Sequence, residues 1–233
     1  VPLSMEAQAE ARFLMLCANN ILKPQDGKPV ISPSQDMVIG CYYLSCIRPG
    51  AKGEGRCFAN EDEAMMAYLC GQIDLQSRIN VRIARKWDDP VTSEYLAENN
   101  ITGGNRDNIY YKRIDTCLGR LILNSNVPQD MGFKPRSTLN DMFALEIDMK
   151  VGKKQLGQIV DMCFRKHGVA ETARVLDNVK AMGYKYSTIG AVTVAVADVI
   201  VPPEKKPILK EAEGRVRKIE KMFKRGLLAE EER

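Results

Sequence analysis

The stretch from Pro202 to Arg233 constrains the fold most, because it describes a helix that cannot stand alone. Apolar residues recur there at alternating steps of three and four, which places them in one narrow seam of the coiled-coil type. A seam this narrow needs a partner helix. Gly226-Leu227-Leu228 is typical of the turn of a helical hairpin, so we expect the second arm to lie beyond this chain. The seam is Leu209, Ala212, Val216, Ile219 and Phe223, and its flanks offer the i,i+4 pairs Glu211–Arg215, Glu213–Arg217 and Glu220–Lys224.

Two helices are predicted near the start of the chain. Ser4 is a natural N-cap with Glu6 in the first turn, and the helical spacing runs on to Asn19-Asn20, which suits a helix end. Pro33-Ser34 opens a second helix, with Asp36 in its first turn. The N-terminal part is therefore expected to be helical.

The middle of the chain predicts mixed structure. Residues 49–55 hold three glycines and indicate a loop, and Asn60 can cap a short helix that ends near Gly71. Residues 78–84 alternate polar and apolar, which predicts a half-exposed strand. Residues 87–110 are polar and are interpreted as a surface insertion, whereas 118–123 form a short apolar element of undecided type.

Helical spacing returns after residue 150. One helix is predicted from Lys153 to His167-Gly168, and a second is predicted to end at Gly183. Residues 192–196 are rich in β-branched side chains and predict a strand.

These patterns predict an α+β, predominantly helical fragment of several subdomains, with short strands and a C-terminal coiled-coil arm. We expect four regions, at 1–50, 51–150, 151–201 and 202–233.

Composition excludes some classes of protein and favours others. The net charge of +4 is only mildly basic and does not by itself indicate a nucleic-acid surface. No apolar run approaches the roughly 20 residues of a membrane span, and no signal peptide is apparent. Seven cysteines at irregular spacing favour reduced thiols in a cytoplasmic protein. Because the chain begins at Val1 without Met, we expect it to be part of a longer protein.

The usual catalytic motifs are absent from the sequence, so we expect no catalytic residue and no metal ligand in this chain. Cys163 could use only His167 as a base, and its place on an apolar helix face favours a core cysteine instead. The carboxylates of Asp88-Asp89 and Glu61-Asp62-Glu63 do not form a convincing metal cradle.

Three residues are candidates for contact with an anion. Gln35 lies at a helix N-terminus, where it could meet an anion or a ribose hydroxyl, or could simply be a first-turn residue. Lys153 and Lys154 open a helix where the dipole disfavours positive charge, so they indicate either an anionic ligand or a solvated pair.

Read together, several stretches are distinctive. The sequence VPLSMEAQAEARFLMLCANNILKPQDGKPVISPSQDMVIGCYYLS resembles the segment of bacterial RNA polymerase β′ subunits that follows their magnesium-binding NADFDGD loop. AKGEG, VGKK, MGYKYST and VIVPPEKKPILKEAE through GLLAEEER resemble later parts of the same family in the same order. The resemblance covers nearly the whole chain and is weak only near 87–110 and 137–148.

This resemblance implies a part of a nucleotidyltransferase that synthesises RNA from nucleoside triphosphates. The family's catalytic Mg²⁺ would be held by aspartates upstream of Val1, so the isolated chain should be inactive. Gln35 would lie toward the active centre, and Lys153 and Lys154 would line the secondary channel through which nucleoside triphosphates enter. The segment would form the active-centre floor and the entry channel.

The resemblance also implies partners. These are the α, β and ω subunits and the rest of β′, with DNA and RNA in the complete enzyme and no membrane. The C-terminal helix resembles the rim where transcription factors dock, and its expected docking residues are Glu213, Arg217, Glu220 and Lys224. Asp177 matches part of a regulatory alarmone site, but Ala170 and Ala181 stand where that site uses other residues, which argues against its presence.

A second hypothesis is a free-standing interaction module, in which the coiled coil binds another protein without any nucleotide chemistry. The absence of an initiator Met and the incomplete hairpin argue against it.

Overall fold

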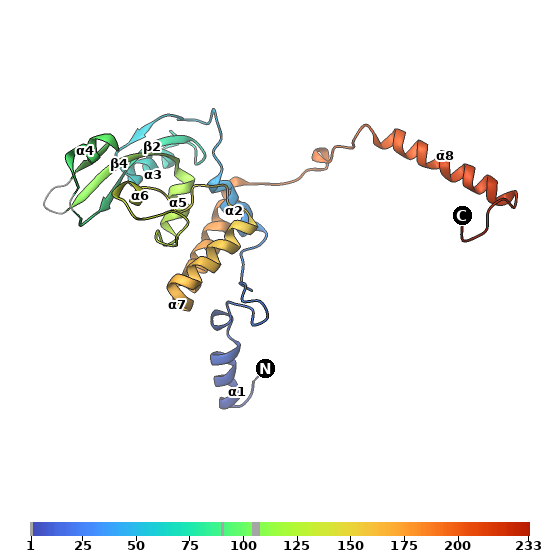
Figure 1. The fold of residues 1–233 in the computed structure, drawn as a ribbon, viewed down its shortest axis with the longest axis horizontal. Helices are drawn as coiled ribbons and strands as arrows, with labels where there is room; N and C mark the ends of the chain where they lie inside the picture. The colour runs from blue at the N-terminus through green and yellow to red at the C-terminus, as the bar shows by residue number, and fades with distance from the viewer. Residues whose placement is uncertain (1, 90, 104–107) are drawn as a thin grey trace. The chain divides into compact units, whose positions relative to one another are not determined.

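The computed structural model describes residues 2–89, 91–103 and 108–233, and divides the chain into two units. The first unit extends to Val192 and contains the sheet and the core (Figure 1). The second begins at Thr193 and contains the C-terminal helix. The predicted class, α+β and predominantly helical, is confirmed.

The N-terminal helix starts as predicted but is shorter. The Ser4 side chain accepts a hydrogen bond from the Ala7 amide, and α1 covers Met5–Glu10. A π-helical turn at Ala11–Met15 and a 3₁₀ turn at Cys17–Asn19 follow. The cause is Asn20, whose side-chain amide donates to the Leu14 and Leu16 carbonyls at 2.7 and 3.1 Å. These bonds replace the backbone donors that a continuing α-helix would supply.

A four-stranded mixed sheet forms the middle of the first unit. The strands are β1 (Cys57–Phe58), β2 (Arg78–Lys86), β3 (Ile101–Gly103) and β4 (Ile109–Cys117), in the order β1-β2-β4-β3. β1 pairs parallel with β2, and the other two pairings are antiparallel. Burial alternates along β2, which confirms the half-exposed strand predicted there.

Short helices accompany this sheet, and α3 and α5 contact its strands. α3 (Glu61–Leu69) begins at Asn60, whose side chain accepts from the Glu63 amide, as predicted. The element of undecided type is α5 (Leu118–Ser125), and it is followed by the four-residue α6 (Leu139–Met142).

The stretch 87–110 is not only a surface excursion. It contains α4 (Ser93–Glu98) and β3, which extends the sheet, and Ile101 is buried in the core. The side chains of Tyr95 and Leu96 pack against that core. Pro90 and residues 104–107 of this stretch lie outside the described residues.

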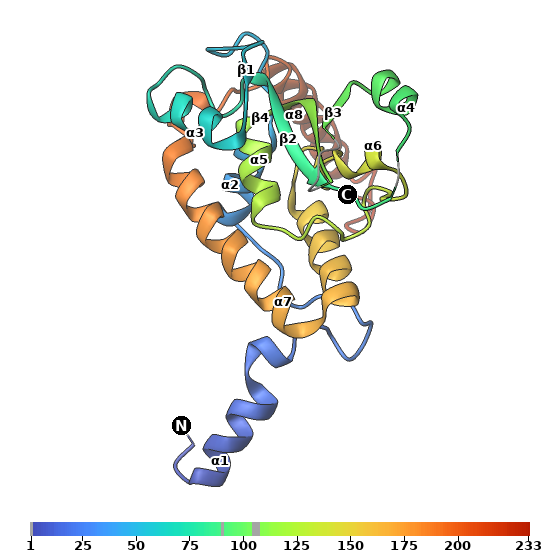
Figure 2. The same cartoon turned by 90° about the vertical axis from the view of Figure 1, so that its left-hand side faces the viewer.

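The long element α7 (Lys153–Gly190) contains two helical arms that meet at Gly168 (Figure 2). Gly168 has φ 77° and ψ −168°, which is not helical, so the predicted break there is confirmed. The buried residues of the first arm are those of the predicted apolar face, namely Leu156, Ile159, Val160 and Cys163.

The predicted helix end at Gly183 is wrong. The helix continues to Gly190 because Gly183 serves a contact between helices: it lies against α2 (Asp36–Ser45). A Cβ on Gly183 would stand 2.7 Å from the Met37 backbone, and one on Gly40 would stand 1.9 Å from the Gly183 carbonyl oxygen. The two backbones therefore touch where neither residue has a side chain.

The predicted strand at 192–196 is also wrong. The segment has no partner strand among the described residues, and Val194 and Val196 are 80% and 92% exposed. Its β-branched residues favour extended structure, but a strand needs a neighbour to pair with. Only a 3₁₀ turn, Val196–Asp198, forms there.

The C-terminal helix α8 covers Lys205–Lys224 and has no buried residue. The seam residues Leu209 and Val216 are 51% and 53% exposed. Gly226 follows with φ 72°, in the left-handed conformation that ends helices. The apolar seam is thus unpartnered within the described part of the chain.

The contact of α2 with α7 gives a stability prediction. Gly183→Ala should lower the free energy of unfolding by about 1–3 kcal/mol, because the new methyl group meets rigid backbone. Gly157→Ala, on the first arm of α7, should raise it by about 0.5–1 kcal/mol, because nothing lies within 4 Å of that position. Urea unfolding followed by the fluorescence of Trp87 measures both, and equal shifts in the two variants would contradict the contact.

Candidate functional site

Gln35 precedes α2 in a strained conformation. Its φ of 50° and ψ of −125° lie in a region that residues with a Cβ rarely adopt. Its carbonyl accepts from the Val38 and Ile39 amides at 3.0 and 3.2 Å, so the backbone is held by the first turn of the helix. The side chain is exposed and has no hydrogen-bond partner among the residues described. The amide is thus free to meet a ligand.

The other end of α2 positions the start of α7. The buried Ser45 hydroxyl donates to the Tyr42 carbonyl at 3.0 Å and accepts from the Val151 amide at 2.8 Å. The Gln155 side chain accepts from the Gly152 amide at 3.2 Å, which closes the first turn of α7. Lys153 and Lys154 follow immediately from this anchored backbone.

Lys153 and Lys154 are both exposed. Among the residues that the structure describes, neither forms an ion pair within 4.0 Å. Two ammonium groups thus stand at the positive end of a helix with no counter-ion in the described ranges, an arrangement that favours an approaching anion.

The structure does not bring Gln35 and the lysine pair into one cluster. They lie toward opposite ends of α2, and ten residues of α-helix span about 15 Å. The three predicted residues therefore do not form a single binding pocket. They form two separate contact points, Gln35 and the lysine pair.

Arg120 and Asn124 of α5 hold the backbone near the start of α7, where the lysine pair lies. The sequence analysis does not predict this role. Arg120 donates to the Ser45 carbonyl at 3.1 Å and pairs with Asp148. The buried Asn124 side chain binds both the amide and the carbonyl of Ile147, at 2.9 Å each. The only available signal was polar residues inside a short apolar element.

A buried carboxylate fixes the loop that precedes this segment. Glu146 is fully buried, accepts from the Phe133 amide at 2.9 Å and pairs with Arg136 at 3.3 Å. Arg136 also donates to the Met142 carbonyl at 3.1 Å. An ion pair with these additional hydrogen bonds is a structural feature, since its groups are turned away from solvent.

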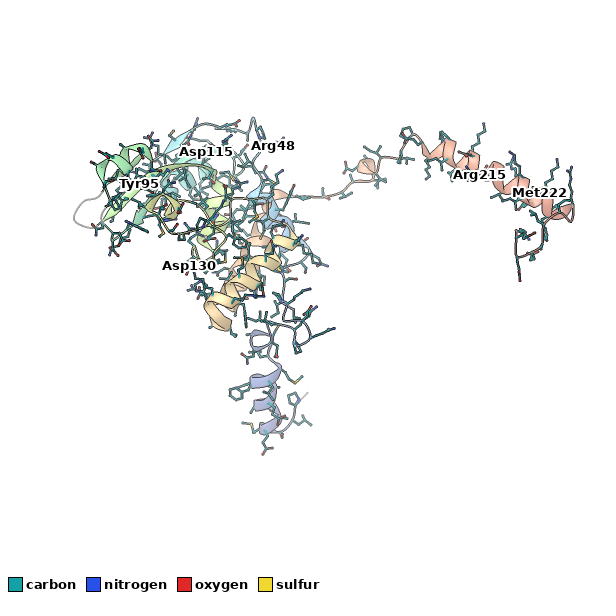
Figure 3. All side chains as sticks on the ribbon, in the orientation of Figure 1. Arg48, Tyr95, Asp115, Asp130, Arg215 and Met222 are labelled. Carbon is teal, nitrogen blue, oxygen red and sulfur yellow. The ribbon has the colours of Figure 1, made fainter. Side chains whose placement is uncertain are left out.

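The cysteine and histidine near the bend of α7 do not form a catalytic pair. Cys163 is fully buried, and burial raises the pKa of its thiol. His167 Nε2 lies 2.8 Å from Asp130 Oδ1, and Figure 3 shows Asp130 beside α7. Although partial burial of Asp130 opposes it, the hydrogen bond from His167 and the charge of Lys166 hold the pKa of this carboxyl below its usual range. Cys163 is a core residue, as predicted.

The other thiols behave similarly where they are buried. All seven cysteines are free, and burial raises the pKa of Cys41 to about 12. A thiol with so high a pKa is not a nucleophile at neutral pH.

The described residues hold no group of three histidine, cysteine, aspartate or glutamate side chains that could bind a metal ion. None of the described helices is long and apolar enough to cross a membrane.

The four predicted docking residues lie exposed on α8. Glu213 and Arg217 approach to 4.0 Å, whereas Glu220 and Lys224 form no ion pair in the described structure. On α7, Asp177 pairs with Lys180 at 2.8 Å, and Ala170 and Ala181 are exposed.

Comparison with known proteins gives one consistent result. The model of "RNA polymerase Rpb1, domain 3" matches residues 20–199. Over all 233 residues the chain is 50% identical to the DNA-directed RNA polymerase subunit beta' of Clostridium acetobutylicum, 52% to that of Clostridium botulinum and 50% to that of Acetivibrio thermocellus. The chain spans 18% of the length of each of these relatives.

The strain at Gln35 gives a second prediction. Gln35→Gly should raise the free energy of unfolding by roughly 1 kcal/mol, because glycine adopts this conformation without a steric cost. Ser34→Gly, at a neighbour without a positive φ, should lower it by about 0.5–1 kcal/mol. Thermal unfolding of both variants checks this, and a loss of stability in Gln35→Gly would show that the backbone is not strained.

Proposed function

This chain belongs to the family of bacterial RNA polymerase β′ subunits, and from that premise we propose that it lines the path of nucleoside triphosphates to the active centre of a DNA-dependent RNA polymerase. The observation that carries the proposal is the exposed pair Lys153 and Lys154, anchored at the start of α7 and without a counter-ion among the described residues. A triphosphate bears several negative charges at neutral pH, so two fixed cations raise its local concentration.

Gln35 has a separate role in this proposal. Its strained backbone fixes an uncharged amide at the start of α2, and such an amide can bond a ribose hydroxyl or a phosphate oxygen. We place it nearer the active centre than the lysine pair, which would meet the substrate earlier in the channel.

The chemistry of RNA synthesis would take place outside this chain. Mg²⁺ supplies charge stabilisation in nucleotidyl transfer, but the described carboxylates do not fit that ion. The Glu63 side chain accepts a hydrogen bond from the Ala59 amide, and the Glu146 carboxylate forms an ion pair with Arg136. The ligands of the ion would belong to a part of the subunit outside this chain, which spans 18% of the length of its relatives.

We propose a division of roles along the chain. Residues 1–50 would flank the active centre, and 51–150 would form the pore and secondary-channel region. Residues 151–201 would begin at the channel with Lys153 and Lys154 and run on near the ω-contacting side, and 202–233 would form the first arm of the rim coiled coil. The exposed seam of α8 supports the last assignment, because it requires a second helix.

The partners follow from this division. They are the α, β and ω subunits, the remainder of β′, DNA and RNA, and transcription factors that dock on α8 at Glu213, Arg217, Glu220 and Lys224. The setting would be the cytoplasm. The alternative, a free-standing coiled-coil module, is not favoured, because the whole chain matches β′ subunits at about half identity.

The lysine pair gives the decisive experiment. In the complete enzyme, Lys153→Glu with Lys154→Glu should raise the apparent KM for nucleoside triphosphates by about tenfold at low salt and by less at high salt. kcat should change little, because the proposed place of the pair is the entry channel and not the site of the reacting atoms. Steady-state RNA synthesis at two ionic strengths measures both parameters.

The matched control keeps the charge. Lys153→Arg with Lys154→Arg should leave KM within about twofold of the parent enzyme, because the attraction depends on charge rather than on side-chain shape. An unchanged KM in the glutamate variant would remove the pair from the channel.

The isolated chain gives a further prediction. It should incorporate no labelled nucleotide on a primed template, with or without Mg²⁺, because its described residues hold no metal-binding cluster. Primer extension above the level of a protein-free reaction would contradict the proposal that the catalytic ligands lie elsewhere.

A further inference from the structure

The outer face of the sheet holds two arginines that have no counter-ion among the described residues. Arg82 on β2 stands directly opposite Arg113 on β4 in the antiparallel register, and both are exposed. Neither meets a carboxylate within 4.0 Å among the residues that the structure describes. Like charges directly opposite each other destabilise a pair of strands. The repulsion between Arg82 and Arg113 therefore destabilises the pairing of β2 with β4.

The same sheet face shows how an arginine is normally neutralised. Arg78 on β2 donates through Nε to both carboxylate oxygens of Asp115 on β4, at 2.9 and 2.7 Å. This hydrogen bond and the carboxylate charge raise the pKa of Arg78. Figure 3 marks Asp115 on this sheet. Further along the same strands, Arg82 and Arg113 have no such partner within the part of the chain that the structure describes.

The arginine pair lines a concavity of about 700 Å³. The Arg82 guanidinium lies 4.6 Å from the centre of the Tyr111 ring, which holds it in place by a cation–π contact. Leu96 of α4 contributes an apolar side chain, and the Thr102 hydroxyl of β3 adds a polar group. The hollow thus combines two guanidinium groups with the apolar side chain of Leu96, and its volume lies within the size range of ligand sites.

The chemistry of the hollow selects an anion. A guanidinium forms paired hydrogen bonds with a carboxylate or a phosphate, and two adjacent guanidinium groups strengthen that preference. Glu61 and Asp62 line the neighbouring concavity, which also includes Arg82. These carboxylates would repel a continuous polyphosphate strand that runs on from the arginines. A short anionic group attached to apolar atoms avoids these carboxylates, because its charge meets the arginines and its apolar atoms meet Leu96.

We propose that this face, defined by Arg82, Arg113, Tyr111 and Leu96, binds an acidic segment of another protein chain. A carboxylate of that segment would bridge the two arginines, and an adjacent apolar side chain would pack on Leu96. The site is separate from the lysine pair and from Gln35, so it adds a protein-docking surface to the proposed nucleotide path and does not depend on it.

Binding of a defined peptide to the full chain tests this. The probe is a fluorescein-labelled peptide that alternates glutamate and leucine, and fluorescence anisotropy gives its Kd at low salt. Arg82→Gln with Arg113→Gln should weaken binding about tenfold or more. The control, Arg165→Gln with Arg174→Gln on the exposed surface of α7, removes the same charge and should change Kd less than about twofold.

Further variants keep the outcome decisive. Arg113→Lys keeps the charge and should still weaken binding several-fold, because a lysine cannot form the paired bonds. If the double variant loses its folded circular dichroism spectrum, the Arg113→Lys variant provides the test in its place. A peptide in which glutamine replaces glutamate should not bind.

Three results would overturn the proposal. One is equal weakening in the sheet and α7 variants, which would mean that only net charge matters. Another is no measurable binding of the glutamate peptide. The third is that tripolyphosphate or single-stranded oligothymidylate displaces the peptide and binds more tightly through the same arginines, which would make the surface a phosphate site.

Discussion

The contact between α2 and α7 is the constraint on which the rest of the first unit depends. Gly40 and Gly183 let the two backbones meet, and on α5 Gly119 lies so close to the Leu44 carbonyl oxygen that a Cβ would stand 2.2 Å from it. α2 is thus held on two sides by backbone contacts that leave no room for a methyl group. Because its position is fixed, the Ser45 hydroxyl meets the Val151 amide and determines where α7 begins. The location of the lysine pair follows from that bond.

This arrangement separates the stability of the site from its charge. A cation at a helix N-terminus costs about 0.3–1 kcal/mol, whereas overpacking a helix contact costs about 1–3 kcal/mol. The buried contacts around Ser45, Asn124 and Val151 lie beneath the surface that presents Lys153 and Lys154. A small electrostatic cost at an exposed helix end is therefore easily tolerated. The stability of the fold therefore does not depend on Lys153 and Lys154, whose charges are unpaired among the described residues.

Local signals predicted those parts of the fold that are locally determined. Ser4 and Asn60 cap their helices through bonds to amides three residues away, and Gly168 breaks α7 by its own backbone freedom. Gly183 was misread because its role depends on a residue of α2 far away in sequence. Residues 192–196 were misread because a strand requires a neighbour that composition does not reveal. Within the site, the exposed lysines were visible in the sequence, but the strain at Gln35 and the support from Arg120 depend on tertiary structure.

The same distinction explains why the arginine pair on the sheet escaped the sequence reading. Arg82 and Arg113 are separated by the whole of α4 and β3, and only the antiparallel register places them opposite each other. In the sequence each is an ordinary polar position of an alternating strand. A formal net charge of +4 gives no hint of them, because they contribute to a total that acidic residues elsewhere nearly balance. What matters for binding is the local imbalance: among the described residues, Arg78 has a carboxylate partner, whereas Arg82 and Arg113 have none. Two surfaces of this chain, the start of α7 and the outer face of the sheet, present positive charge that the fold holds in place. These surfaces are therefore the ones best suited to bind an anionic partner.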